Sequence, residues 1–326
     1  MTDTTNPLIV AGSANPALAR AVAAGLGVEP TSAEVDRFPD GELRPAVGDV
    51  RGGDVYVVQP TSPPVNEHLV ELLLLLDACR RAGAARITAV VPYFGYARQD
   101  RRSRPGQAIG ARVAADAIAA AGAARLLVVD AHPAAFESMC PIPVETLSAL
   151  RVLADALDAG AAGPRVVVAP DLGAVKLAER LAPRLGLRVV VVRKSRVSGS
   201  RVAAEELIGE VEGCEAIIVD DMITTGGTVE AAARLLVARG ARPRPLVAAT
   251  HGLLVDPALD RLGRLGVSRL LVTDTVPVGA PGTAPPGTAP PGTAPTPEVC
   301  SVAPLLAEAV GRLHREEPLD DLGPPG

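Results

Sequence analysis

Ile217-Ile218-Val219-Asp220-Asp221-Met222-Ile223-Thr224-Thr225-Gly226-Gly227-Thr228 is the most informative segment of this chain. An apolar run ends in two adjacent carboxylates, hydroxyls and glycines follow, and an Ala/Leu-rich segment with helical spacing comes next. This order predicts a strand, a loop and a helix, and open α/β sheets bind ligands at the carboxyl ends of their strands. Two glycines permit close backbone approach, and N–H groups at the start of the helix can hold a phosphate.

The polar groups of this loop indicate a phosphorylated sugar as the ligand. Two carboxylates would repel a phosphate, so Asp220 and Asp221 should face sugar hydroxyls, either directly or through Mg²⁺. The loop has no lysine and no GxxxxGK[ST] pattern, which excludes a Walker A nucleotide site. The alternative is a plain turn with two solvated aspartates. The ordered coincidence of apolar run, acidic pair and Thr/Gly loop favours the ligand site.

Composition places the chain among soluble globular proteins. It has 326 residues, 48% of them hydrophobic and 21% charged, which is enough for two ordinary domains. A net charge of −5 without a basic tract gives no support for nucleic-acid binding. No run of about 20 uncharged apolar residues occurs, so no membrane span is expected. The N-terminus lacks the layout of a signal peptide and the four cysteines form no CxxC pair, so we expect a cytoplasmic protein without zinc or disulfides.

Apolar runs alternate with helical patterns along the chain, which predicts an α/β fold of two domains, each with a mostly parallel central sheet flanked by helices. The predicted strands are 8–11, 54–58, 87–91, 126–130, 166–169, 189–192, 216–220, 245–250 and 269–273. The predicted helices include 65–82, 109–121, 174–184, 228–239 and 299–314. We assign residues 1–150 to an N-terminal domain and 151–314 to a C-terminal domain. The low-complexity stretch 279–297 is read as an insert, and 315–326 as a loose tail.

Aromatic residues and arginines in the first half indicate a nucleotide site. The chain has three Phe, three Tyr and no Trp, so their positions carry information. Phe38 lies in the polar stretch 37–42, where an aromatic face beside carboxylates suits a purine. Tyr93 and Phe94, at the end of a predicted strand, fit the core at least as well. The arginines at 98, 101, 102 and 104 form either a loop that closes over a polyphosphate or a solvated surface, and the pattern alone leaves both open.

A set of segments then occurs in the order found in ribose-phosphate pyrophosphokinases. They are residues 37–42, 63–68, 93–101, 130–132, Asp171, 194–196 and 220–228. From about residue 8 to residue 314 the chain resembles this family, which makes phosphoribosyl pyrophosphate. The loop at 220–228 resembles that of type I phosphoribosyltransferases. The resemblance implies two type I phosphoribosyltransferase-like domains, Mg-ATP and ribose 5-phosphate as substrates, Mg²⁺ as cofactor and assembly as a homo-oligomer, a dimer or a hexamer.

The resemblance also implies a role for each matching residue. Lys194 and Arg196 would be the catalytic pair on a flexible loop after a strand, and His132 and Asp171 the magnesium-site residues. Since Mg²⁺ prefers oxygen, His132 would act through a coordinated water. The ATP contacts would be Phe38, Asp40, Gly41, Glu42, Arg98, Gln99 and Asp100. The ribose 5-phosphate contacts would be Asp220, Asp221, Thr224, Thr225, Gly226, Gly227 and Thr228, together with Arg196.

Lysine usage supports the role of Lys194 independently. Lys176 and Lys194 are the only lysines among 32 basic residues. A lysine kept in so arginine-biased a chain indicates a need for a compact point charge, as phosphoryl transfer requires. The alternative is an accidental surface lysine.

Some positions depart from the family pattern. Thr224 stands where many members have aspartate, and Leu172 follows Asp171 in place of histidine, which indicates a divergent branch. Two other functions stay open: a phosphoribosyltransferase that consumes phosphoribosyl pyrophosphate, and a non-catalytic regulatory relative. The first leaves the segments at 38–42 and 96–101, and Lys194, without roles. The second should have lost Lys194 and Arg196, and both are present.

Overall fold

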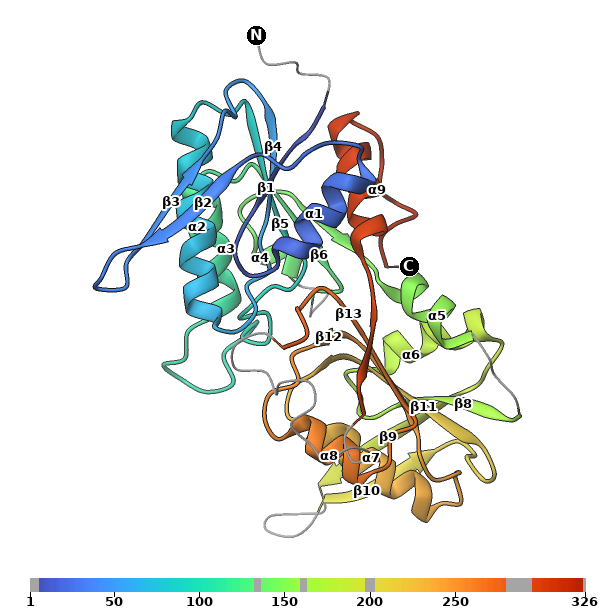
Figure 1. Ribbon diagram of the computed structural model, residues 1–326. Helices are drawn as coiled ribbons and strands as arrows, with labels where there is room; N and C mark the ends of the chain where they lie inside the picture. Colours follow the sequence, from blue (N-terminus) through green and yellow to red (C-terminus); the bar gives the residue numbers. More distant parts are fainter. Residues whose placement is uncertain (1–5, 132–135, 159–162, 197–202, 280–294, 325–326) are drawn as a thin grey trace. The chain divides into compact units, whose positions relative to one another are not determined.

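The computed structural model describes residues 6–131, 136–158, 163–196, 203–279 and 295–324, without the side chains of 194–196 and 203–205. Within these ranges the chain forms two α/β units. The first comprises Met1–Ser148, Thr275–Pro277 and Ser301–Gly326, and the second Ala149–Asp274 and Val278–Cys300. Figure 1 labels their elements. The predicted fold class is confirmed.

A parallel sheet with the strand order β1-β4-β5-β6-β7 forms the centre of the first unit. Its strands are β1 (Leu8–Ala11), β4 (Asp54–Val58), β5 (Arg86–Val91), β6 (Arg125–Val129) and β7 (Val144–Leu147). The first four were predicted, whereas β7 is short and half polar and gives no apolar run. An antiparallel hairpin of β2 (Ala33–Arg37) and β3 (Leu43–Val47) lies apart from this sheet.

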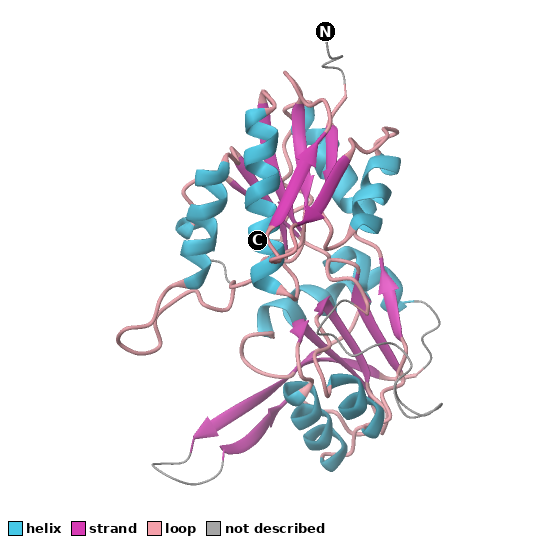
Figure 2. Ribbon diagram, turned by 60° about the vertical axis from the view of Figure 1, so that its left-hand side comes forward, coloured by secondary structure: helices cyan, strands magenta, loops and turns pink. Residues whose placement is uncertain are grey.

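Helices cover both faces of the first sheet (Figure 2). They are α1 (Pro16–Gly25), α2 (Val65–Arg81), α3 (Gly110–Ala121), the short α4 (Phe136–Met139) and α9 (Ala303–His314). The core on one face joins Leu72 and Leu75 of α2 and Ala115 of α3 to Val57 and Val91 of the strands. Tyr93 and Phe94 are also buried, as the core reading of these rings predicted.

The C-terminal helix differs from its prediction in extent and place. The predicted helix 299–314 is a strand, β14 (Pro297–Cys300), followed by α9, because Val299 and Cys300 complete a parallel ladder on β13. Helix α9 belongs to the first unit, not to a domain of residues 151–314. It packs against α1, where a Cβ built on Gly25 would lie 2.8 Å from the Ala307 Cβ.

The tail after α9 is bonded to the first unit, so the prediction of a loose tail is wrong for its described part. The Ser148 N–H donates to the Leu322 carbonyl at 2.9 Å, and Arg312 forms an ion pair with Asp321. The tail has no apolar periodicity, so its sequence does not reveal that residues 301–324 fold onto the first unit.

The second unit contains a sheet with the order β10-β9-β8-β11-β12-β13-β14. Its strands are β8 (Arg165–Ala169), β9 (Val189–Arg196), β10 (Ala203–Ile208), β11 (Glu215–Ile223), β12 (Leu246–Gly252), β13 (Arg269–Thr273) and β14. All neighbours are parallel except β10, which pairs antiparallel with β9 at the edge. In Figure 2 the β9–β10 ribbon extends beyond the rest of this sheet.

Successive residues of the central strands point to two separate cores. Val166, Val168 and Ile218 face the core formed with α7 (Gly227–Ala238) and α8 (Ala258–Arg264). Val167 and Ile217 face the core formed with α5 (Leu150–Asp158) and α6 (Val175–Leu181), which a 3₁₀ turn (Ala182–Leu185) continues. Burial on both faces explains why these strands read as unbroken apolar runs.

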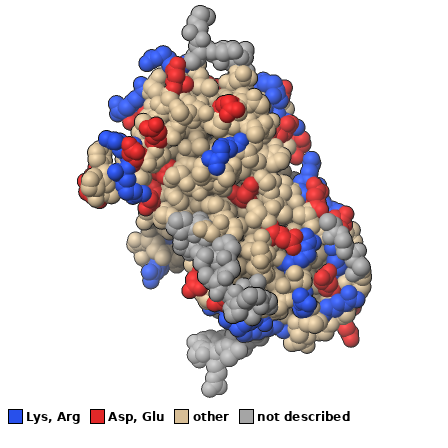
Figure 3. Space-filling view, viewed as in Figure 1, with Lys and Arg blue, Asp and Glu red and all other residues tan. Residues whose placement is uncertain are grey.

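The predicted insert at 279–297 is described only at its two ends. Residues 280–294 lie outside the described part of the chain, and Pro297 already belongs to β14. No described helix is long and apolar enough to cross a membrane. Charges of both signs are interspersed on the face shown in Figure 3, which agrees with the absence of a basic tract in the sequence.

Candidate functional site

The acidic pair and the Thr/Gly loop lie at the carboxyl edge of the second sheet, as predicted. Strand β11 continues to Ile223, three residues beyond the predicted end, because Met222 and Ile223 still pair with β12. Both Asp220 and Asp221 therefore lie on the strand itself, and the loop is confined to residues 224–226. The helix α7 begins at Gly227, directly after it.

Asp171 follows β8, the parallel neighbour of β11, and so reaches the same edge. Its Oδ1 accepts the N–H groups of Gly173 at 2.8 Å and Ala174 at 3.3 Å, which orients the carboxylate. Burial, together with the charges of Asp221 and Asp171, raises the pKa of Asp220 to about 8. The edge thus concentrates negative charge that a bound cation or sugar hydroxyls would offset.

These carboxylates suit Mg²⁺ in chemistry without forming a finished cage. Oxygen is the ligand that Mg²⁺ prefers, and the ion usually keeps waters and shares substrate phosphates. Among the residues that the structure describes, no group of three or more His, Cys, Asp or Glu is close enough to hold a metal by itself. The donor set at Asp171 and Asp220 therefore fits an ion that arrives with its waters or with a substrate. His132, the other predicted magnesium-site residue, lies outside the described residues.

The Thr/Gly loop has the backbone geometry that an anion site requires. Gly226 has φ = 74°, in the left-handed region that glycine tolerates best, and its carbonyl accepts the Glu230 N–H at 2.9 Å. The loop therefore turns directly into the first turn of α7, whose N–H groups have no partner within the helix. Thr225 is exposed, and Thr224 and Thr228 are half-buried.

The predicted catalytic pair lies on a strand instead of a loop. Lys194 and Arg196 are both within β9, where their backbones pair with Glu205 and Ala203 of β10. The predicted strand ended at Val192, because its apolar run stops there. Hydrogen bonding to β10 extends it over polar residues. The side chains of Lys194 and Arg196 are outside the described part of the chain.

The predicted purine loop is the turn of the β2–β3 hairpin. The Phe38 N–H donates to the Glu42 carbonyl at 2.8 Å, and Asp40 accepts the Glu42 N–H at 3.1 Å. Gly41 has φ = 98°, which explains a glycine here. Phe38 is 42% exposed, with the Arg44 guanidinium 5.0 Å from its ring centroid. An exposed ring in a polar turn is available to stack on a ligand.

Arg98, Gln99 and Asp100 lie in the turn that follows β5, at the carboxyl edge of the first sheet. The Gln99 N–H donates to the Tyr96 carbonyl at 2.8 Å, and its own carbonyl accepts the Ala111 N–H of α3 at 3.2 Å. Arg98 and Gln99 are exposed, and Asp100 is half-buried. The backbone of this segment is thus fixed while its polar side chains are open to solvent.

Two residues at the start of α2 connect the predicted ATP segments. Glu67 forms an ion pair with Arg37 at the base of the hairpin, and Asn66 accepts the Tyr96 hydroxyl. The sequence pattern assigns no role to this segment. Its contacts link the start of α2 to the base of the hairpin and to Tyr96, just before residues 98–100.

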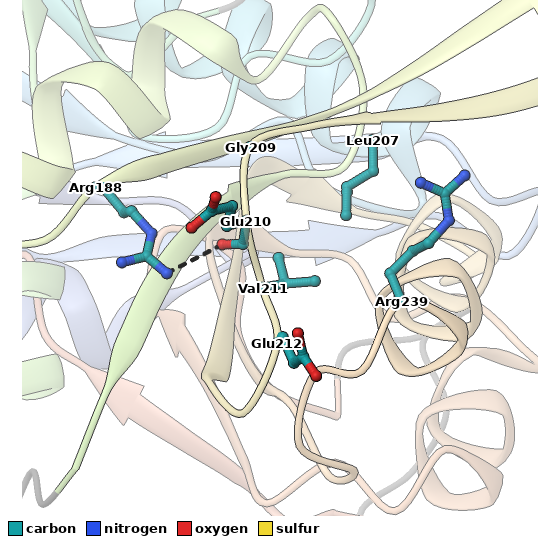
Figure 4. Close-up of a pocket in the computed structure, with 7 residues that line it drawn as sticks. All are labelled: Arg188, Leu207, Gly209, Glu210, Val211, Glu212 and Arg239. Carbon is teal, nitrogen blue, oxygen red and sulfur yellow. Dashed lines mark hydrogen bonds between the residues drawn. The ribbon is translucent and has the colours of Figure 1, made fainter.

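The charged cavity of the second unit lies elsewhere. It has a volume of about 630 Å³ and is lined by residues 209–212, which lead into β11, and by Arg188 and Arg239 (Figure 4). Arg188 donates to the Glu210 carbonyl at 3.2 Å. Because β11 begins after these residues, the cavity is at the amino edge of the sheet, opposite the acidic pair.

Comparison with known proteins assigns these features to one family. The model of the N-terminal domain of ribose phosphate pyrophosphokinase matches residues 7–122, and a phosphoribosyl transferase domain model matches residues 147–256. Ribose-phosphate pyrophosphokinases of Aquifex aeolicus and Rhodopirellula baltica are each 41% identical, over 94% and 96% of this chain and 95% and 97% of theirs. The crystal structure of phosphoribosylpyrophosphate synthetase from Mycobacterium smegmatis, 36% identical, superposes with a TM-score of 0.85 over 96% of this chain and all of that one.

Proposed function

The chain belongs to the ribose-phosphate pyrophosphokinase family, and from that premise we propose that it transfers the β,γ-pyrophosphoryl group of Mg-ATP to the C1 hydroxyl of ribose 5-phosphate. The products are phosphoribosyl pyrophosphate and AMP. The observation that carries the proposal is the strand, loop and helix at 215–238, with Asp171 beside it at the same sheet edge.

Ribose 5-phosphate would bind at that edge. The sugar hydroxyls pair with the carboxylates of Asp220 and Asp221, which need positive or hydrogen-donating partners. The 5-phosphate accepts hydrogen bonds from the loop N–H groups and from the hydroxyls of Thr224, Thr225 and Thr228. This division places the phosphate at the helix start and the C1 end of the sugar on the side of the acidic pair.

ATP would bind to the first unit, where Phe38 stacks on the adenine, and Asp40 and Glu42 accept hydrogen bonds from it. Exposure of the Phe38 ring and the rigid turn that carries it support this role. Arg98 and Gln99 would hold the polyphosphate, with Asp100 beside them. Their backbone is fixed on α3 while their side chains are open to solvent.

Lys194 and Arg196 would stabilise the charge that develops on the transferring group. Lys194 would supply a compact point charge and Arg196 a planar fork, two residues apart on β9. Attack by the C1 hydroxyl on the β-phosphorus needs in-line positioning of the two substrates, which the binding residues provide. Mg²⁺, held by Asp171 and Asp220 through oxygen, would neutralise charge on the phosphate oxygens when bound.

From family membership we also propose that the protein assembles as a homo-oligomer and acts in the cytoplasm. The reaction itself is tested by incubating the purified protein with Mg-ATP and ribose 5-phosphate and resolving AMP and phosphoribosyl pyrophosphate by chromatography. Equal amounts of the two products support the proposal. Unchanged ribose 5-phosphate, or ADP in place of AMP, contradicts it.

A further inference from the structure

We infer that Arg261 is a positioning residue for the phosphate loop, that is, residues 224–226 together with Gly227 and Thr228 at the start of α7. It lies on α8, more than thirty positions after the loop, and no feature of the sequence connects the two. The inference rests on the proposed function, because the loop is assigned to ribose 5-phosphate there. Arg261 itself is placed behind the loop backbone, and its effect on the ligand passes through that backbone.

One hydrogen bond joins Arg261 to the loop. Its Nη1 donates to the Thr225 carbonyl oxygen at 3.2 Å. A peptide unit is planar, so its carbonyl and the following N–H point in opposite directions. Fixing the Thr225 carbonyl toward Arg261 therefore turns the Gly226 N–H to the other side, where it is available to an anion.

Gly227 allows the guanidinium to approach the start of α7. A Cβ built on Gly227 would lie 3.2 Å from the Arg261 Nη1, tighter than ordinary contact. The loop itself contains neither lysine nor arginine. Arg261 therefore places a positive charge directly behind the N–H groups that would receive the phosphate, adding to the field of the helix start.

One further contact holds Arg261 in this orientation. Its Nε lies 3.7 Å from Glu230 Oε2 in the first turn of α7, and the side chain is 31% exposed. The start of α8 also lies close to the loop, since a Cβ built on Gly226 would be 3.6 Å from the Ala258 carbonyl. Both ends of the guanidinium are thus tied to the segment that they would position.

The test compares Arg261→Ala with the unmodified enzyme in steady-state kinetics and in calorimetric binding of ribose 5-phosphate. We expect the KM and Kd for ribose 5-phosphate to rise about tenfold, the effect of losing one charge-assisted hydrogen bond. The KM for Mg-ATP and the kcat should change by less than about twofold. Arg261→Lys keeps the charge and one donor, so it should recover ribose 5-phosphate affinity to within about threefold.

Two arginines of the same unit provide matched controls. Arg264 is an exposed residue of α8, and Arg234 pairs with the same Glu230 at 2.6 Å. Arg264→Ala and Arg234→Ala should leave both constants for ribose 5-phosphate unchanged. An unchanged KM and Kd in Arg261→Ala, a fall confined to kcat, or a Lys variant as weak as the Ala variant would overturn the inference. An unmodified protein that binds ribose 5-phosphate without forming AMP refutes the proposed reaction alone, since the Kd comparison still decides the role of Arg261.

Discussion

At the scale of single residues, Asp220 is a candidate ligand-binding acid whose burial lowers the stability of the second unit when it is charged. Asp220 is held among carboxylates at the sheet edge, and its pKa rises to about 8 because of burial and then the charges of Asp221 and Asp171. An unfolded aspartate titrates near 3.9. The folded state therefore binds a proton more tightly than the unfolded chain. This tighter proton binding stabilises the folded state fully at low pH. The stabilisation is lost as pH rises through the folded pKa of about 8, where the buried carboxyl becomes charged.

Asp220→Asn should therefore separate stability from activity. The amide keeps the acceptor for the Asp221 N–H, which now donates to Asp220 Oδ1 at 2.9 Å, but carries no charge. Urea unfolding of the ligand-free protein should show the variant more stable than the unmodified protein by about 1 to 2 kcal/mol at pH 8 and by less at pH 5. Activity should fall at both pH values. If the stability gain of the variant over the unmodified protein were smaller at pH 8 than at pH 5, the pKa of Asp220 would not be raised in the folded state.

Lys194 gives a second prediction at this scale. Lys194→Ala should lower kcat by about 10²- to 10³-fold while the KM of both substrates stays nearly constant, since a group that stabilises developing charge acts in the transition state. Lys176, the other lysine, lies exposed on α6 and provides the control. Lys176→Ala should keep full activity. A raised KM with a constant kcat would make Lys194 a binding residue.

At the scale of elements, the sequence predicted the buried parallel strands well and the edges poorly. Strands such as β4 and β8 are buried on both faces, so each reads as one apolar run with definite ends. β2, β7 and β14 are short, mix apolar with polar residues and are mostly half-buried or exposed, so they have no such signal. The end of β9 depends on its pairing with β10, which periodicity along one strand does not contain.

Some residues of the candidate site could likewise be predicted from the sequence, and others could not. Asp220 and Thr225 could be predicted because the ligand chemistry is concentrated in one continuous loop. Arg261 and Glu67 could not, because each acts through a contact with a segment distant in sequence. Glu71 illustrates the limit further: it interrupts an apolar helix, yet it is 1% exposed and accepts the Ser13 N–H at 2.6 Å.

Hydrogen bonds to Asp54 attach the end of α9 to the central sheet of the first unit. Asp54 of β4 accepts hydrogen bonds from Arg86 at 2.7 Å and from His314, near the end of α9, at 2.8 Å. Burial raises the pKa of Asp54, but these bonds outweigh it and hold the pKa below its usual value. Its contribution to stability is present above the unfolded pKa of about 3.9 and is lost as pH falls through the folded value.

Asp54→Ala should lower the free energy of unfolding by about 2 to 3 kcal/mol at pH 6, because it leaves a partly buried arginine without its main partner. At an acidic pH below the unfolded pKa of about 3.9 the difference from the unmodified protein should be smaller. Asp116→Ala removes an exposed ion pair with Arg112 on α3 and should cost less than about 0.5 kcal/mol. Urea titrations at both pH values measure the free energy of unfolding of the two variants and of the unmodified protein. Equal losses in the two variants would contradict the prediction, because they would show that the bonds to Asp54 stabilise the fold no more than an exposed ion pair does.

At the scale of the whole molecule, the proposed reaction would use residues of both units. The predicted ATP contacts are all in the first unit, and the acidic pair, the phosphate loop and the strand of Lys194 are all in the second. The acidic pair of the second unit and residues 98–100 of the first lie at the carboxyl edge of a parallel sheet, the usual location of ligands in this architecture, whereas residues 38–42 lie in the turn of the β2–β3 hairpin. The family match extends over both units, which agrees with a reaction that joins two substrates.

The proposed reaction requires that the C1 oxygen of ribose 5-phosphate attacks phosphorus. Ribose 5-phosphate labelled with ¹⁸O at C1 tests this step, in a reaction short compared with exchange of that oxygen with water. We expect mass spectrometry to find the ¹⁸O in phosphoribosyl pyrophosphate, in the bond between C1 and the β-phosphorus, with AMP formed in equal amount. Loss of the label from the product would mean that the bond at carbon breaks instead, and would refute the proposed reaction.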